Sequence, residues 1–126
     1  MRKLRHPGTV MGLFALGVEA TGVASGAYVY GDFPIKILGV PLCIPVMWVL
    51  IMAMAYVISE RYGPTIGVLA ICSIDLMILE PIAYSLNWWR WMSPYSFLII
   101  PFGTVANALV WGLMGIIGIK LWENVR

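Results

Sequence analysis

The chain has 126 residues, of which 61% are hydrophobic and only 11% are charged, and its mean hydropathy is +0.90. Soluble domains are roughly half apolar and about a quarter charged, and a chain this short cannot bury so much apolar surface in its own core. A formal net charge of +2, without a basic run interleaved with aromatic residues, gives no sign of nucleic-acid binding. The composition predicts an integral membrane protein whose apolar surface contacts the lipid bilayer.

Residues that commonly hold metals are scarce. Cys43 and Cys72 each lie in an apolar run without a CxxC motif, and His6, the only histidine, lies in the polar amino terminus. The sequence therefore predicts two buried free thiols and no histidine-based or cysteine-based metal site.

Four hydrophobic stretches have the length of about 20 residues that a helix needs to cross a bilayer. Segments with turn-forming residues separate them. The predicted fold class is therefore all-α: one multi-pass domain over residues 1–126 in the cell membrane, built as a bundle of four transmembrane helices. The predicted spans are residues 9–30, 38–58, 64–86 and 97–121.

The basic residues predict the orientation of this bundle. If the amino terminus is cytoplasmic, six of the eight Lys and Arg residues face the cytoplasm, and only Lys36 and Arg90 face outside. Both termini are therefore expected in the cytoplasm. The first span follows a basic segment, as a signal peptide does, but it is too long for one and contains Glu19, so we expect it to be retained.

The first span carries a stripe of small residues interrupted by one acid. Residues three and four apart lie on one face of a helix, and small residues there let a second helix approach closely. Glu19 is therefore expected to project into a helix contact or into a cavity between small neighbours. A hydrogen bond between helices and a catalytic role both fit this position. The stripe consists of Gly8, Gly12, Ala15, Glu19, Gly22 and Gly26.

The second span opens with two prolines, Pro41 and Pro45. Prolines at this spacing predict an irregular entry into the helix. Irregular backbone at membrane depth is tolerated where it faces protein or a cavity, so we do not expect this entry to face lipid.

The third span contains two acids, Asp75 and Glu80. Both are expected to face the interior of the bundle, because a charged side chain in lipid is costly. Five residues correspond to about 140° around a regular helix, so the two acids are not expected to share one narrow face. Pro81 cannot donate a backbone hydrogen bond and is predicted to kink the helix beside Glu80. A carboxyl group in an apolar surrounding favours its neutral form, which suits a general acid as well as a structural hydrogen-bond donor.

Aromatic residues gather where the spans meet the membrane interfaces. Anchoring at the interface explains most of them, including Tyr28 and Tyr30 at the end of the first span. Three tryptophans in the third loop, at positions 88, 89 and 91, exceed what anchoring needs and leave a functional role open. In the fourth span, Asn107 and Trp111 lie one turn apart and both are expected to point inward. Glycines at positions 112, 115 and 118 predict close helix packing.

The motifs, taken in order, resemble the integral-membrane carotenoid biosynthesis proteins. That family includes the bisanhydrobacterioruberin hydratases of archaea and the carotenoid 1,2-hydratases of bacteria. The resemblance begins with a Glu, Gly-rich spacing and a Gly-x-Tyr-x-Tyr segment from Glu19 to Tyr30. It continues through Gly-Val-Pro at residues 39–41, Trp48, Asp75 to Pro81, Trp-x-Trp at residues 89–91, and Asn107 to Trp111.

The resemblance implies that the protein adds water to a terminal isoprenoid double bond of a carotenoid or another isoprenoid lipid. Asp75 or Glu80 would be the acid that forms a tertiary carbocation, and Glu19 would be its partner. No metal or organic cofactor is implied. Polar and aromatic side chains would line the polyene path, where the aromatic π faces stabilise the cation. The implied substrate-binding residues are Tyr28, Tyr30, Trp48, Trp89, Trp91 and Asn107.

Two departures from the family leave a second interpretation open. Glu80 stands where the family usually has Asp, and members of the family are longer and have more spans. The alternative is a non-catalytic accessory or structural subunit of a larger membrane complex. An enzyme is expected to have an elongated internal pocket, reached from the membrane, with at least two acids at its wall. A subunit is expected to have a filled bundle whose small-residue faces contact partner chains.

Overall fold

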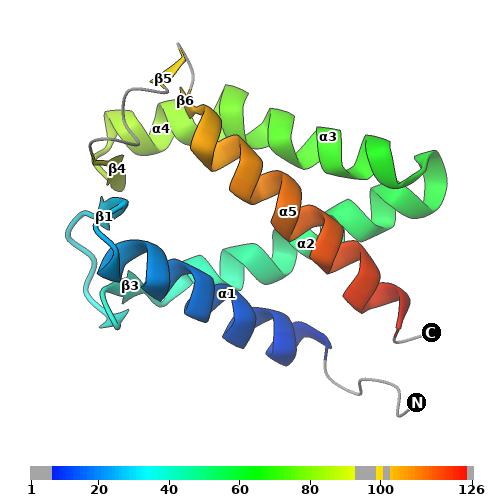
Figure 1. Ribbon diagram of the computed structural model, residues 1–126, viewed down its shortest axis with the longest axis horizontal. Coiled ribbons are helices and arrows are strands. Elements are labelled where there is room, and N and C mark those ends of the chain that lie inside the picture. The colour runs from blue at the N-terminus through cyan, green and yellow to red at the C-terminus, as the bar shows by residue number, and fades with distance from the viewer. Residues whose placement is uncertain (1–6, 93–98, 101–102, 125–126) are drawn as a thin grey trace.

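Helices make up most of the computed structural model, which describes residues 7–92, 99–100 and 103–124. Helix α1 is followed by α2, by a run of α3, the π-helical turn η1 and α4, and then by α5 (Figure 1). The bounds are Pro7–Ala24 for α1, Cys43–Tyr62 for α2, Pro64–Ile74 for α3, Asp75–Leu79 for η1, Glu80–Ser85 for α4 and Val105–Glu123 for α5.

Two of these helical runs are long and apolar enough to cross a membrane. Among the described residues they are α2, with 20 residues, and the continuous run Pro64–Ser85, with 22 residues. Helix α1 contains a shorter apolar stretch, Gly8–Ala24. The prediction of a mostly helical protein with apolar helices of membrane-spanning length is confirmed in these elements, and a bundle of four spans stays a prediction.

The first and second helices differ from their predicted limits at the ends that face each other. Helix α1 ends at Ala24, because Gly26 adopts a backbone φ of 76° that no helix continues. Helix α2 begins only at Cys43, since Leu38 and Gly39 also have positive φ values, 52° and 80°. The predicted irregular entry into the second helix is confirmed.

Short β ribbons replace these missing helical turns, which corrects the expectation of a purely helical chain. Strand β1 pairs antiparallel with β4, β2 with β3, and β5 with β6. Their bounds are Tyr28–Tyr30 for β1, Lys36–Ile37 for β2, Val40–Pro41 for β3, Trp89–Trp91 for β4, Ile99–Ile100 for β5 and Gly103–Thr104 for β6. The fourth helix begins at Val105, and residues 97, 98, 101 and 102 of its predicted range lie outside the described residues.

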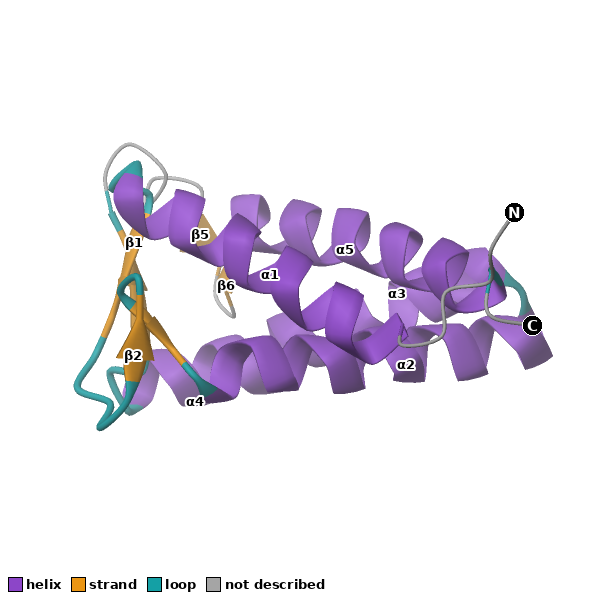
Figure 2. Ribbon diagram, turned by 90° about the horizontal axis from the view of Figure 1, so that it is seen from below, coloured by secondary structure: helices purple, strands orange, loops and turns teal. Residues whose placement is uncertain are grey.

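Helix α2 is the centre of the bundle and packs against α1, α3 and α5, whereas α1 and α5 make few contacts with each other. The glycines of α5 allow close packing, because an added Cβ at Gly115 would overlap Ile71 and one at Gly118 would overlap Met52. This confirms their predicted role. The start of α1 and the end of α5 lie at the same end of the molecule as the turn between α2 and α3 (Figure 2). The paired strands β1 and β4 lie at the opposite end (Figures 1 and 2).

Candidate functional site

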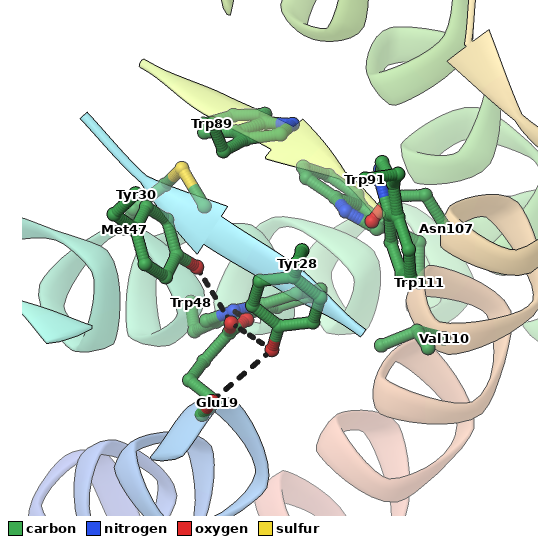
Figure 3. A pocket seen from close by; sticks show the side chains of 10 residues that line it. All are labelled: Glu19, Tyr28, Tyr30, Met47, Trp48, Trp89, Trp91, Asn107, Val110 and Trp111. Carbon is green, nitrogen blue, oxygen red and sulfur yellow. Dashed lines mark hydrogen bonds between the residues drawn. The ribbon is translucent and has the colours of Figure 1, made fainter. Parts of the chain in front are cut away.

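The carboxyl group of Glu19 is buried near the end of α1 and accepts three side-chain hydrogen bonds. The Tyr28 and Tyr30 hydroxyls donate to Oε2 at 2.5 and 2.6 Å, and the Trp48 indole Nε1 donates to Oε1 at 2.6 Å (Figure 3). Glu19 is only 5% exposed. Three side-chain donors therefore satisfy the hydrogen-bonding capacity that this carboxyl group loses by being buried away from water.

The local chain geometry explains how these donors reach Glu19. Gly26 turns the chain back after α1, so β1 runs beside the helix that it has just left. The Tyr28 phenol lies directly over Gly22, where an added Cβ would overlap the ring. Tyr28 and Tyr30 are two residues apart in a strand and therefore point to the same side of it. The small-residue stripe of α1 thus leaves room for a hydrogen-bonding tyrosine.

Burial and the neighbouring acid both act on these tyrosines. Burial raises the pKa of Tyr28 and of Tyr30 above the ordinary phenol value, and the negative charge of Glu19 raises both further. The phenols therefore keep their protons over the physiological pH range and act as donors to Glu19.

A second group of acids lies across the bundle, where Asn107 holds Asp75 and Glu80 together. The Asn107 Nδ2 group donates to Asp75 Oδ1 and Oδ2 at 2.9 and 2.8 Å, and it also donates to Glu80 Oε1. Asp75 is 0% exposed and Glu80 is 3% exposed. Two carboxylate charges on one amide, shielded from water, would repel each other strongly, so the pair is most stable when it holds one proton.

The placement of Asp75 and Glu80 corrects the expectation that they cannot share one face of the helix. The five residues from Asp75 to Leu79 form a π-helical turn, and the Glu80 backbone N–H donates to the Asp75 carbonyl. This i to i+5 hydrogen bond stacks the two acids one above the other. Pro81 has no N–H to donate to the carbonyl four residues earlier, which accounts for a wider turn here. The predicted weak point at Pro81 is therefore a π-helical turn.

The aromatic strands β1 and β4 connect the two groups of acids. Tyr28 pairs with Trp91 and Tyr30 with Trp89, and the ring centroids of these pairs lie 4.9 and 6.3 Å apart. The Trp89 Nε1 donates to Glu80 Oε1 at 3.1 Å, and Trp91 also interacts with the Glu80 carboxyl group. The ribbon thus touches Glu19 through its tyrosines and Glu80 through its tryptophans.

A small interior pocket lies between the two groups. Its volume is about 30 Å³, and ten residues from α1, α2, α5, β1 and β4 line it (Figure 3). Among the described residues Glu19 is the only acid in its wall, whereas Asp75 and Glu80 accept hydrogen bonds from Asn107. A larger groove of about 440 Å³ runs between α3 and α5, but neither Glu19, Asp75 nor Glu80 lines it. The lining residues of the small pocket are Glu19, Tyr28, Tyr30, Met47, Trp48, Trp89, Trp91, Asn107, Val110 and Trp111.

The predicted site residues all lie at this end of the bundle, but in two groups. Seven of them line the small pocket, while Asp75 and Glu80 hydrogen-bond to its Asn107 wall. Asn107, which the sequence predicts to bind substrate, contacts both acids in the structure. The predicted site lacked Trp111, although its inward orientation was expected: it is 2% exposed and lies 4.8 Å from Trp48 between ring centroids. Its spacing one turn after Asn107 was the available signal.

Comparison with known proteins identifies the family. A family model described as "Carotenoid biosynthesis protein" matches residues 2–125. Comparisons with curated proteins and with solved structures gave no match. The family match covers nearly the whole chain, including every segment that carries the buried acids and the aromatic ribbon. The chain therefore belongs to the carotenoid biosynthesis protein family.

Proposed function

We propose that this protein is a membrane-bound hydratase that adds water to a terminal isoprenoid double bond of a carotenoid. One observation carries the proposal: a donor-rich carboxyl group, Glu19, lines one aromatic pocket, and a second buried pair, Asp75 and Glu80, accepts hydrogen bonds from Asn107 in the wall of that pocket. Hydration of an alkene needs an acid and a base in one apolar site. Family membership supports the substrate class.

In the proposed reaction the Asp75–Glu80 pair is the acid. Its proton is transferred to the CH carbon of the double bond. The π electrons form the new C–H bond and leave a tertiary carbocation on the terminal carbon, which carries the two methyl groups. Water then donates an electron pair to that carbon, forming the C–O bond, and releases a proton to Glu19. Return of this proton to the pair restores the site. The net change is addition of H and OH, with no oxidation or reduction.

The aromatic walls suit the cationic intermediate. The faces of Trp and Tyr rings attract positive charge. The pocket lining contains Trp48, Trp89, Trp91 and Trp111 and, in the part of the chain that the structure describes, no Lys, Arg or His. The carboxylate of Glu19 adds a fixed negative charge. Such surroundings stabilise a carbocation more than the neutral polyene from which it forms, which lowers the barrier to protonation.

The small size of the pocket limits how the substrate enters. About 30 Å³ cannot hold the end of a polyene, and the wall carries one acid where two were expected. Helices α1 and α5 both line the pocket and make few contacts with each other. We therefore propose that the polyene enters from the bilayer between α1 and α5 and displaces the ribbon of β1 and β4 from Asn107.

We propose that the protein crosses a cell membrane as a bundle of four helices with both termini in the cytoplasm. The common position of the start of α1 and the end of α5 supports an even number of crossings (Figure 2). Reporter enzymes that are active only in the cytoplasm, fused to each terminus and to the loop near Asp32, test this topology. Activity at both termini and not at the loop is expected, and activity at the loop contradicts it.

The reaction is tested by expressing the chain in cells that accumulate an acyclic carotenoid with terminal isopropylidene groups. Growth in H₂¹⁸O followed by mass spectrometry should yield a hydroxylated product that carries ¹⁸O. Asp75→Asn and Glu19→Gln should each lower product formation by about 10²–10⁴-fold, the range expected for loss of general acid–base catalysis. Asp32→Asn, an exposed acid in the loop after β1, is the matched control. Wild-type protein that is present in the membrane but forms no ¹⁸O product contradicts the proposal.

A second function, a non-catalytic subunit of a larger membrane complex, has one observation in its favour. The bundle is filled, with Trp48 and Trp111 only 1% and 2% exposed in its core. In that case the acids only hold the helices together. Native mass spectrometry of protein extracted in mild detergent distinguishes the two: a monomer or homodimer with bound pigment favours the hydratase, and a stoichiometric assembly with other chains and no pigment favours the subunit.

A further inference from the structure

The pocket between Glu19 and Asn107 has the size of a water site. Its volume of about 30 Å³ exceeds the roughly 10–15 Å³ that a buried water molecule needs, and it is far too small for a polyene. It is lined mainly by aromatic rings, together with Met47 and Val110. Volume alone does not decide whether water enters such a space, because apolar cavities of this size stay dry.

Polar groups on opposite sides of this pocket favour the entry of water. Glu19 lies on one side and Asn107 on the other (Figure 3). The Tyr28 and Tyr30 hydroxyls each donate a hydrogen bond to Glu19. Their oxygen lone pairs are therefore available to accept a hydrogen bond from a water molecule. A buried water typically makes about three hydrogen bonds, and these four groups offer that number.

We propose that this pocket binds the water molecule that attacks the carbocation, with Glu19 as the group that orients it and accepts its proton. The assignment of this water as the nucleophile rests on the proposed hydratase function, whereas the water site itself rests on the pocket. A water that donates one proton to Glu19 presents an oxygen lone pair away from α1. That direction leads toward Asn107, behind which the Asp75–Glu80 pair supplies the other proton.

This arrangement keeps the acid and the base apart until the substrate arrives. The pair hydrogen-bonds to Asn107 on one side of the pocket and Glu19 lies on the other, so the pocket separates the acid from the base. A double bond placed between Asn107 and the water would have the acid on one side and the nucleophile on the other. Addition of H and OH from opposite faces of the double bond follows from this geometry.

The test fills the pocket without touching a polar group. Val110→Leu adds one methylene at the pocket wall, and Val46→Leu makes the same change on α2 beside Met47, at a side chain that is 57% exposed. Val110→Ala enlarges the pocket. Infrared spectra of the purified proteins in H₂O and H₂¹⁸O identify a bound water by an O–H stretching band that shifts with the heavier isotope.

We expect the band in wild type, Val46→Leu and Val110→Ala, and its loss in Val110→Leu. Val110→Leu should also form hydration product at least tenfold more slowly while carotenoid binding, measured by quenching of tryptophan fluorescence, is unchanged. Absence of the band in wild type, or its persistence in Val110→Leu, overturns the water site. A band that behaves as expected in a protein that forms no product supports the water site and overturns only the hydratase function.

Discussion

Glu19 and the Asp75–Glu80 pair lie at the same end of the molecule, but their hydrogen-bond donors differ. One carboxyl group at Glu19 has three donors from three side chains, whereas the two carboxyl groups of the pair share three side chains between them, Asn107, Trp89 and Trp91. Many donors favour an ionised acid, and few donors favour one that keeps a proton. Similar side chains therefore have different hydrogen-bonding surroundings, as a reaction that needs both an acid and a base requires.

The largest expected difference between the two regions is the effect of replacing an acid by its amide at Glu19. Glu19→Gln removes the carboxyl group that accepts three hydrogen bonds. The NH₂ group of the glutamine is itself a donor, so it would lie against one of the three donors and lose that hydrogen bond. Each hydrogen bond to a charged group contributes roughly 1.5–3 kcal/mol, so we expect a loss of about 2–4 kcal/mol after partial repacking. Denaturant unfolding in detergent, followed by tryptophan fluorescence, measures it. An unchanged midpoint would mean that Glu19 is not held as a carboxylate.

A smaller effect tests how the chain brings Tyr28 to Glu19. Gly22→Ala should destabilise the protein by about 1–3 kcal/mol, because its Cβ overlaps the Tyr28 ring. In a Tyr28→Ala background the same change should stabilise the protein by up to about 1 kcal/mol, since alanine is the better helix former. A double-mutant cycle measures this reversal of sign. Equal effects in both backgrounds would show that Gly22 is not required to make room for the Tyr28 ring.

Alkaline pH offers a test confined to the Glu19 region. Tyr28 and Tyr30 have pKa values raised above the ordinary phenol value of about 10. Above pH 10 the unfolded chain therefore releases protons that the folded protein still holds, and the free energy of unfolding should fall as pH rises. Unfolding midpoints measured between pH 8 and about pH 11 should show this fall, and the double variant Tyr28→Phe with Tyr30→Phe should show less of it. An equal fall in the double variant assigns the effect to other groups.

The smallest effect is expected on the other side of the pocket. Asp75→Asn removes one of two competing carboxyl groups and supplies a new donor to Glu80, so stability should stay within about 1 kcal/mol of wild type. The same unfolding measurement as for Glu19→Gln gives a direct comparison. A loss as large as that of Glu19→Gln would show that the Asp75–Glu80 pair is stabilised by charge and does not hold a proton.

How far the sequence predicts this site depends on how far apart the partners are in the chain. Tyr28 and Tyr30 follow Glu19 after one glycine-assisted turn, so the order of residues already indicates that they lie near it. Asn107 lies 32 positions from Asp75, and no local pattern gives that contact. The error over Asp75 and Glu80 has a different origin: a regular helical period was assumed, and Pro81 favours a π-helical turn that changes the period just where the acids lie.

By itself the sequence determined that the chain is apolar and mostly helical, that Glu19, Asp75 and Glu80 are buried, and which family it belongs to. These follow from composition and from the order of motifs, which depend on residue types and short spacings. Only the tertiary structure decided that the acids form two groups, that Asn107 joins two of them, and that the strands β1 and β4 close a small pocket between them. Contacts between distant segments depend on how helices pack, and that packing is set by the sum of many small surface complementarities along the whole bundle.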